Sequence, residues 1–187
     1  MRVALLGGSF NPPHLAHQMA CLYLLEGRGF ERVWLMPCFL HAFDKQLVSF
    51  EHRVAMCALL SRPFGGRVVV SEVEQNLAGD KPNRTIDTMQ YLDAHHAELE
   101  FTLVIGTDIL DEVSKWKDFD KLKQKYPILV LKRTGFEPST NDWDISELAF
   151  PQISSSSIRE RLGQGEQLSG LVPATVAGYI RQNSLYR

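Results

Sequence analysis

The 187-residue sequence has few cysteines, no excess of charge of either sign and no long apolar run. Its cysteines, Cys21, Cys38 and Cys57, are odd in number and show no CxxC spacing, so neither a disulfide framework nor a cysteine-ligated zinc site is expected. The longest apolar run, residues 33–40, is far shorter than a membrane span and contains a proline. Secreted and membrane proteins are therefore disfavoured, and we expect a cytoplasmic protein.

Charge is balanced, with 20 lysines and arginines against 22 aspartates and glutamates and a formal net charge of −2. Such a balance predicts no general attraction to nucleic acid or to an anionic membrane. Lysines gather at residues 115–125, but acidic residues lie among them, which is typical of a solvated helix face. The sequence therefore predicts neither nucleic acid nor membrane as a partner.

Short apolar runs alternate with amphipathic segments along the chain. The apolar runs predict β-strands at residues 2–6, 32–36, 67–70, 100–105 and 127–131. Helical spacing and cap residues predict helices at residues 14–26, 49–60, 85–96, 115–125, 155–162 and 173–182, while residues 37–48, 76–84 and 134–152 look irregular. This order predicts an α/β fold with a doubly wound parallel sheet. We expect a single domain over residues 1–187, with a C-terminal helical part from about residue 153.

The segment after the first predicted strand, residues 7–17, reads GGSFNPPHLAH. It lies where open α/β sheets bind ligands, and its two glycines let a backbone pass close to a phosphate. Asn11 is a favourable N-cap and Pro12 suits the first helical position, which places His14 and His17 near the positive end of the helix dipole. These groups suit a polyphosphate. The structural alternative is a tight glycine turn with histidines that only cap or cover the helix.

Other phosphate and metal signatures are missing from this segment. It lacks the GxGxxG spacing of dinucleotide-binding domains and the GKS/T of a P-loop, which disfavours hydride transfer and a Walker-type mechanism. An HExxH motif is also absent, so we expect no protein-held metal.

A second segment, residues 153–161, reads ISSSSIRER. Ser157 and Glu160 fit a capping box, and a well-capped helix is the plain interpretation. Several hydroxyls at a helix start, with Arg159 one turn in, would also hold an anion. Two such helix starts at one crevice could bind a triphosphate from both sides.

Together these segments resemble the two signatures of the nucleotidylyltransferase superfamily, T/HxGH at residues 8–17 and ISSTxIR at residues 153–159. Further features resemble the bacterial nicotinate-nucleotide branch of the nicotinate/nicotinamide mononucleotide adenylyltransferases. These features are the TIDTM of residues 85–89, the GTD of residues 106–108 followed by Trp116, and the C-terminal stretch from residue 172 to residue 186. The resemblance spans nearly the whole chain and implies a Rossmann-like nucleotidylyltransferase fold with C-terminal helices.

Three departures from the family pattern stand out. Ala16 occupies the glycine position of HxGH, and Ser156 replaces the threonine of the second signature while keeping its hydroxyl. The loop after the second strand carries His41 and Lys45 in place of a Pro-Pro-His-Lys pattern, so the phosphate-contacting role of these two residues is left open.

The resemblance implies transfer of AMP from ATP to nicotinate mononucleotide, or to nicotinamide mononucleotide, with release of pyrophosphate in NAD biosynthesis. ATP would be the co-substrate, with Mg²⁺ held mainly by phosphates and water. His17 and His14 are the implied catalytic residues. The implied ATP-binding residues are Gly8, Ser9, Phe10, His14, His17, Gly106, Asp108, Ser155, Ser156, Ile158 and Arg159.

On the mononucleotide side the resemblance implies Lys45, Thr85, Thr88 and Trp116, with the Trp116 indole stacked on the pyridine ring. Thr85 and Asp108 have a structural alternative as helix caps, and Trp116 as a core aromatic. Two other functions remain open at this point: another nucleotidylyltransferase, such as one acting on phosphopantetheine, and a non-catalytic nucleotide sensor. The sequence leaves the oligomeric state and the choice between nicotinate and nicotinamide undecided.

Overall fold

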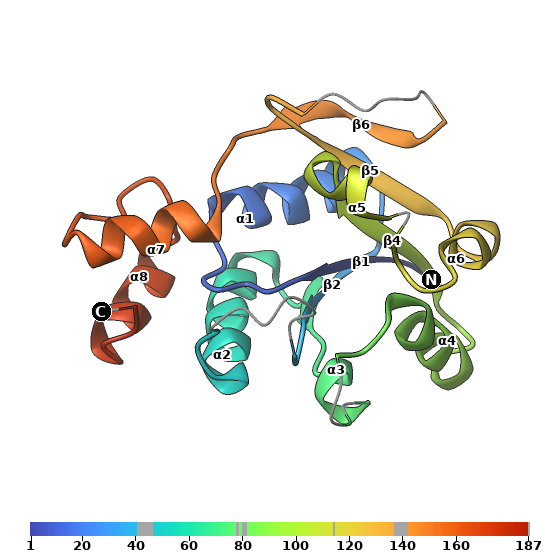
Figure 1. Cartoon of the computed structure of the whole chain (residues 1–187), viewed down its shortest axis with the longest axis horizontal. Helices are drawn as coiled ribbons and strands as arrows, with labels where there is room; N and C mark the ends of the chain where they lie inside the picture. Colours follow the sequence, from blue (N-terminus) through green and yellow to red (C-terminus); the bar gives the residue numbers. More distant parts are fainter. Residues whose placement is uncertain (41–46, 78, 80–81, 114, 137–141, 187) are drawn as a thin grey trace.

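The computed structural model describes residues 1–40, 47–77, 79, 82–113, 115–136 and 142–186. A six-stranded parallel sheet with strand order β3-β2-β1-β4-β5-β6 forms its centre (Figure 1). The strands are β1 (Arg2–Gly8), β2 (Arg32–Pro37), β3 (Val68–Val70), β4 (Glu100–Gly106), β5 (Ile128–Arg133) and β6 (Asp144–Phe150). The order reverses between β1 and β4, and a doubly wound sheet opens its ligand crevice at such a switch point.

Helices connect the strands and cover both faces of the sheet. They are α1 (Leu15–Leu22), α2 (Phe50–Ser61), α3 (Val73–Asn76), α4 (Thr85–His95), α5 (Leu110–Val113), α6 (Phe119–Lys125), α7 (Ser155–Gly163) and α8 (Ala174–Gln182). Three helical segments of other types add to them: the π-helix η1 (Tyr23–Gly27) and the 3-10 helices η2 (Arg62–Phe64) and η3 (Thr107–Ile109). The α/β prediction with a doubly wound parallel sheet is confirmed.

Alternate side chains of each strand enter two separate cores, because successive residues of a strand point to opposite faces. In β1, Ala4 and Leu6 pack into the core beneath α1, α2, α7 and α8. Val3 and Leu5 pack into the core that α4 and α6 cover. Burial on both faces explains why the strands read as continuous apolar runs.

The start of the first helix and the strand β6 differ from the sequence-based expectation. The first helix begins at Leu15 with His14 as its N-cap, so Asn11 and Pro12 belong to the preceding turn. Residues 134–152 include β6, although they look irregular in the sequence. β6 lies at the sheet edge and buries only Ser146 and Phe150 well, so it lacks the apolar run that marks the inner strands.

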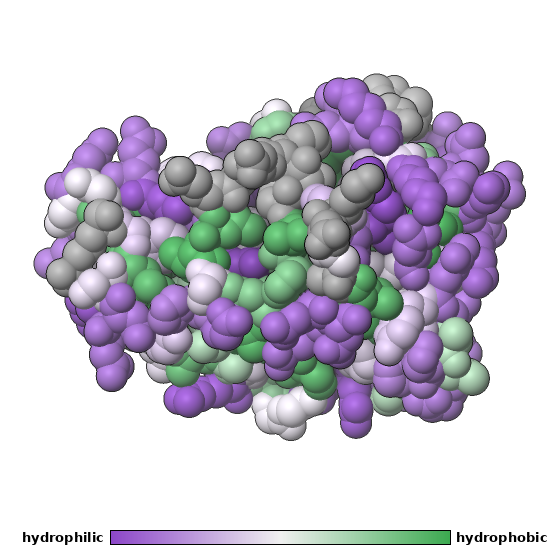
Figure 2. Space-filling view, turned by 60° about the horizontal axis from the view of Figure 1, so that its bottom comes forward, coloured by the Kyte–Doolittle hydropathy of each residue, from purple (hydrophilic) through white to green (hydrophobic). Residues whose placement is uncertain are grey.

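The surface is mixed. Figure 2 shows hydrophobic residues gathered near the middle of the face that this view brings forward, with hydrophilic residues on both flanks. No helix in the described part of the chain is long and apolar enough to span a bilayer.

Candidate active site

The candidate site lies at the carboxyl ends of β1 and β4, which are neighbours in the sheet. Figure 1 shows α7 and α8 beyond the end of β1, with α1 running back over the sheet. The turn after β1 holds Phe10 at a positive φ of 46°, with its ring buried. That ring lies 4.8 Å, centroid to centroid, from the imidazole of His17. The turn therefore packs directly against His17 of the first signature.

His14 and His17 stack at the start of α1, with ring centroids 3.7 Å apart and an interplanar angle of 29°. The backbone N–H of His14 donates to Nδ1 of His17 over 3.1 Å. Because Nδ1 accepts this bond, the proton of neutral His17 sits on Nε2, which remains a donor. Nδ1 of His14 is buried and has no hydrogen-bond partner within the described residues. A ligand atom would complete its bonding.

Burial keeps both imidazoles neutral. Desolvation lowers the pKa of His17 to about 3, and the positive charge of Arg133 adds to this effect. The pKa of His14 is lowered by desolvation, then by His17 and by Arg133. At neutral pH the pair therefore offers hydrogen bonds to a ligand without carrying net charge.

The start of α7 is tied to the turn that precedes α1. Ser155 Oγ donates to the carbonyl of Pro12 over 2.8 Å, and Arg159 Nη1 donates to the carbonyl of Asn11 over 2.7 Å. Arg159 Nη2 also contacts Ser156 Oγ over 3.2 Å. The structure thus brings together the two signature segments, although they are far apart in the sequence.

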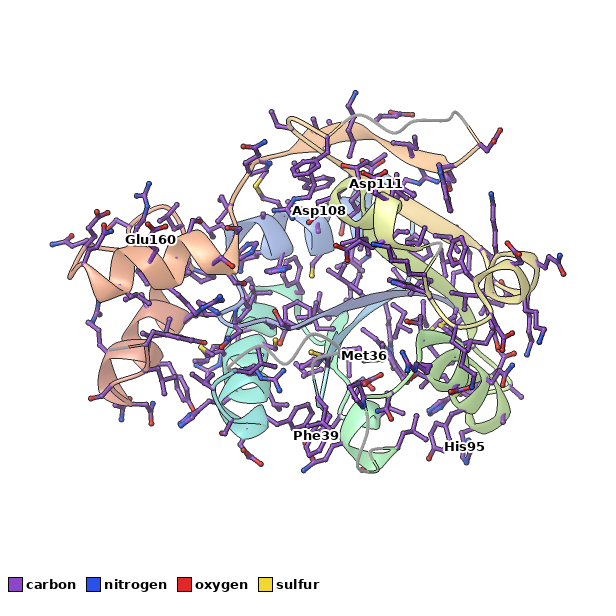
Figure 3. All side chains as sticks on the ribbon, viewed as in Figure 1. Met36, Phe39, His95, Asp108, Asp111 and Glu160 are labelled. Atoms are coloured by element: carbon purple, nitrogen blue, oxygen red, sulfur yellow. The ribbon has the colours of Figure 1, made fainter. Side chains whose placement is uncertain are left out.

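The exits of β4 and β5 add Arg133, which the sequence analysis missed. Its guanidinium donates to Asp108 Oδ2 over 2.6 Å and to the carbonyl of Ile153 over 2.8 Å. At Gly106 an added Cβ would collide with the Asp108 carboxylate, which explains a glycine there. Figure 3 shows Asp108 beside α5. Arg133 ends β5, and the fold brings it next to the second signature segment. The sequence does not show this neighbourhood, so Arg133 could be found only from the topology.

The start of α4 carries Thr85 and Thr88. Thr88 is fully buried, and its hydroxyl donates to Oε1 of buried Glu74 over 2.9 Å. Asn83 Nδ2 donates to Oε2 of the same carboxylate over 2.9 Å. Arg84 is the N-cap of α4, so Thr85 is not the cap. Glu74, which the sequence analysis missed, therefore fixes the residues on both sides of Thr85.

Trp116 is partly buried between α5 and α6, with its ring 6.3 Å from that of Phe119 in an edge-to-face arrangement. The next residue, Lys117, forms an exposed ion pair with Asp87 of α4 at 3.0 Å. The structure thus links the Trp116 segment to the helix that carries Thr85 and Thr88. A hollow of about 420 Å³ opens at this end of α4, lined by Leu77, Gly79, Pro82, Asn83, Arg84, Asp87 and Thr88.

The other predicted site residues divide into three groups. Gly8 ends β1 and Ser9 lies in the turn with Phe10, and both are partly buried. Ile158 points into the core, and its N–H bonds to the carbonyl of Ser154 within α7. Lys45, like His41, lies outside the described residues. The described residues hold no group of three or more His, Cys, Asp or Glu side chains that would suit a metal ion.

Comparison with known proteins identifies the family of the chain. The model of the cytidylyltransferase-like family matches residues 5–161, and together with the doubly wound fold this match defines the chain as a nucleotidyltransferase. A protein named "Probable nicotinate-nucleotide adenylyltransferase" from Anaeromyxobacter dehalogenans (strain 2CP-C) is 44% identical, over 99% of this chain and 96% of its own length. A protein of the same name from Myxococcus xanthus (strain DK1622) is 42% identical, over 100% of this chain and 95% of its own length. The chain therefore belongs to the nicotinate-nucleotide adenylyltransferase family.

Solved structures match the fold. The nicotinic acid mononucleotide adenylyltransferase of Plasmodium falciparum, complexed with NaAD, superposes with a TM-score of 0.85 and covers 99% of this chain and 97% of its own. Its sequence identity is 20%, so this likeness speaks for the fold alone.

Proposed function

We propose that the protein transfers the AMP moiety of ATP to nicotinate mononucleotide, giving deamido-NAD and pyrophosphate. The observation that carries the proposal is the meeting of the stacked His14–His17 pair with the start of α7 at the sheet's switch point. The full-length identity to relatives of that name supports the same activity.

The reaction places modest demands on the protein. A phosphate oxygen of the mononucleotide attacks the α-phosphorus of ATP, a new P–O bond forms, and the bond from the α-phosphorus to the bridging oxygen breaks as pyrophosphate leaves. Positioning and neutralisation of charge dominate such a transfer. His17 suits contact with the α-phosphate, because its Nε2–H can donate without losing a proton. His14 lies beside it and would bind phosphate.

The remaining roles follow the geometry. Ser155, Ser156 and Arg159 at the start of α7 would hold the β- and γ-phosphates, and Gly8, Ser9 and Phe10 would line the pocket through their backbone. Gly106 and Asp108 would lie near the adenosine, with Arg133 beside them; Ile158 supports α7 from the core side. This division treats residues 1–187 as one domain that α7 and α8 complete.

On the acceptor side, Trp116 would stack on the pyridine ring, with Thr85 and Thr88 at the start of α4 nearby and Lys45 as a further contact. Mg²⁺ would be carried by the triphosphate and water, where it neutralises charge on the leaving group. The chain's part is then to orient the triphosphate with Arg159 and the serines.

A direct assay separates this proposal from its rivals. Purified protein with ATP and Mg²⁺ is offered nicotinate mononucleotide, nicotinamide mononucleotide and phosphopantetheine, and pyrophosphate release is followed. We expect the nicotinate substrate to give the highest kcat/KM. Release only with phosphopantetheine would indicate another nucleotidylyltransferase. Tight ATP binding by calorimetry with no release from any acceptor would indicate a non-catalytic sensor.

A further inference from the structure

Arg53 of α2 is a buried arginine that no part of the proposed mechanism uses. Only 1% of its surface is exposed, and it is the largest side chain among the fully buried ones in the described part of the chain. Burying a guanidinium is unfavourable unless its donors are satisfied. Its hydrogen bonds therefore show what holds it there.

The guanidinium donates to four backbone carbonyls from three separate segments. Nη1 reaches Ser9 over 3.1 Å and Cys38 over 2.6 Å, Nη2 reaches Phe39 over 3.2 Å, and Nε reaches Val48 over 3.1 Å. Ser9 belongs to the turn after β1, Cys38 and Phe39 follow β2, and Val48 precedes α2. A single rigid fork thus fixes the exits of two adjacent strands and the entry to α2.

These four hydrogen bonds, called the Arg53 clamp from here on, connect to the first signature. Val48 N–H donates to Asn11 Oδ1 over 3.3 Å, and the Tyr186 hydroxyl donates to the same oxygen over 2.8 Å. The Asn11 carbonyl accepts from Arg159, which the proposed mechanism assigns to the triphosphate. Arg53 is therefore connected, through backbone and side chain, to the turn between the two histidines and β1.

The position of these segments in the sheet indicates which substrate lies next to the Arg53 clamp. In the sheet order β2 lies on one side of β1 and β4 on the other. Figure 3 shows Met36 and Phe39 on one side of β1, with Asp108 on the opposite side. The β2 exit and the entry to α2 therefore lie on the side of β1 away from Asp108 and Arg133, which face the ATP side of the proposed mechanism, whereas the Ser9 turn lies between the two sides, at the end of β1 itself.

We propose that Arg53 is a positioning residue for the acceptor mononucleotide. It holds the Ser9 turn and the β2 exit in the register that adenylyl transfer requires, without touching either substrate. The inference rests on the proposed function. Small errors in position matter in such a site, because a displacement of about 1 Å can lower a rate by about 100-fold.

The test compares three variants in the pyrophosphate assay, at a temperature where thermal unfolding shows each one folded. Arg53→Met keeps an unbranched side chain that reaches as far as the Nε position but removes every donor, and Arg53→Lys keeps the charge and part of the donors. Met56→Ala is the matched control, since Met56 lies three residues along the same helix and is fully buried without joining the clamp. Affinity for ATP alone is measured by calorimetry.

We expect Arg53→Met to lower kcat/KM for nicotinate mononucleotide by about 30-fold or more, with ATP affinity within about three-fold of wild type, in line with lost positioning. Arg53→Lys should recover part of the loss, and Met56→Ala should lower the melting temperature yet keep kcat/KM. Equal losses in Arg53→Met and Met56→Ala, or equal losses for ATP and mononucleotide, overturn the inference. If Arg53→Met does not fold, wild-type kcat/KM in Arg53→Lys overturns it. An inactive wild type contradicts the proposed function instead.

Discussion

The imidazoles of His14 and His17 stack 3.7 Å apart, and the backbone N–H of His14 holds Nδ1 of His17. This relationship makes Nε2 of His17 a donor at neutral pH. His17→Ala should therefore lower kcat by about 100- to 1,000-fold, the usual cost of losing one transition-state hydrogen bond. Steady-state kinetics measure this, with His95→Ala as control because His95 is exposed and far along α4. An unchanged kcat would remove His17 from the mechanism.

Acid should destabilise the protein through the same pair. The ordinary pKa of 6.5 applies in the unfolded chain, whereas burial lowers the pKa of His17 to about 3 in the folded protein and lowers that of His14 as well. The unfolded state therefore binds more protons below pH 6.5, and the free energy of unfolding should fall by about 1.4 kcal/mol per pH unit for each histidine. Above pH 7 the pair should have no such effect.

Urea unfolding at about pH 7.5, 6.5 and 5.5 measures this dependence, because these values span the range in which an ordinary histidine titrates. The double variant with His14→Gln and His17→Gln should show a shallower loss of stability in acid. Identical slopes for wild type and double variant would show that the pair is not held neutral.

Arg133 should tune the histidines. Its charge contributes to the lowered pKa of His17, so Arg133→Met should raise that pKa while desolvation, the larger cause, keeps it below the ordinary value of 6.5. Histidine titration by NMR follows the change, with Arg28→Met, which removes a surface ion pair with Asp144, as the control. A His17 pKa that does not move would place Arg133 outside the electrostatics of the site.

Glu74 should anchor the start of α4. In Glu74→Gln a neutral amide replaces the carboxylate, so the hydrogen bonds to Thr88 and Asn83 lose their charge assistance and the free energy of unfolding should fall by about 1 kcal/mol. KM for the mononucleotide should rise, because Thr85 lies between the two anchored residues. Glu72→Gln is the matched control, since Glu72 is exposed and caps α3 without a side-chain bond. Equal stability of the two variants would contradict the anchoring role.

Trp116 provides a spectroscopic prediction. If its indole stacks on the pyridine ring, nicotinate mononucleotide should quench tryptophan fluorescence, and Trp116→Ala should abolish the quenching and raise KM by up to about 10-fold. Trp143→Phe is the control, because Trp143 packs against Phe119 and Lys123 near the sheet edge. Quenching that persists in Trp116→Ala would assign the signal to another tryptophan.

Local pattern and long-range contact explain which parts of the molecule the sequence could reveal. The inner strands are apolar runs because both faces of the sheet are covered, and the two signature segments carry their chemistry in consecutive residues. β6 escaped detection because an edge strand exposes most of its side chains. Asn11 is a residue type typical of a helix cap, yet its side chain accepts hydrogen bonds from Tyr186 and Val48 instead.

The positioning residues were hidden for a related reason. Arg53 binds backbone carbonyls, Glu74 binds residues 83 and 88, and Arg133 binds residues 108 and 153. The partners of Arg53 are backbone carbonyls, which are the same at every residue, and the side-chain partners of Glu74 and Arg133 lie 9 to 25 residues away in the sequence. Only the folded chain shows them.

The central claim is that the bond broken and remade is at the α-phosphorus of ATP. ATP labelled at the α-phosphorus, incubated with the wild-type protein, Mg²⁺ and nicotinate mononucleotide, tests it directly. We expect the label to appear in deamido-NAD and unlabelled pyrophosphate to form in equal amount. Label that stays in ATP, or that appears in free AMP without a dinucleotide, would contradict the account.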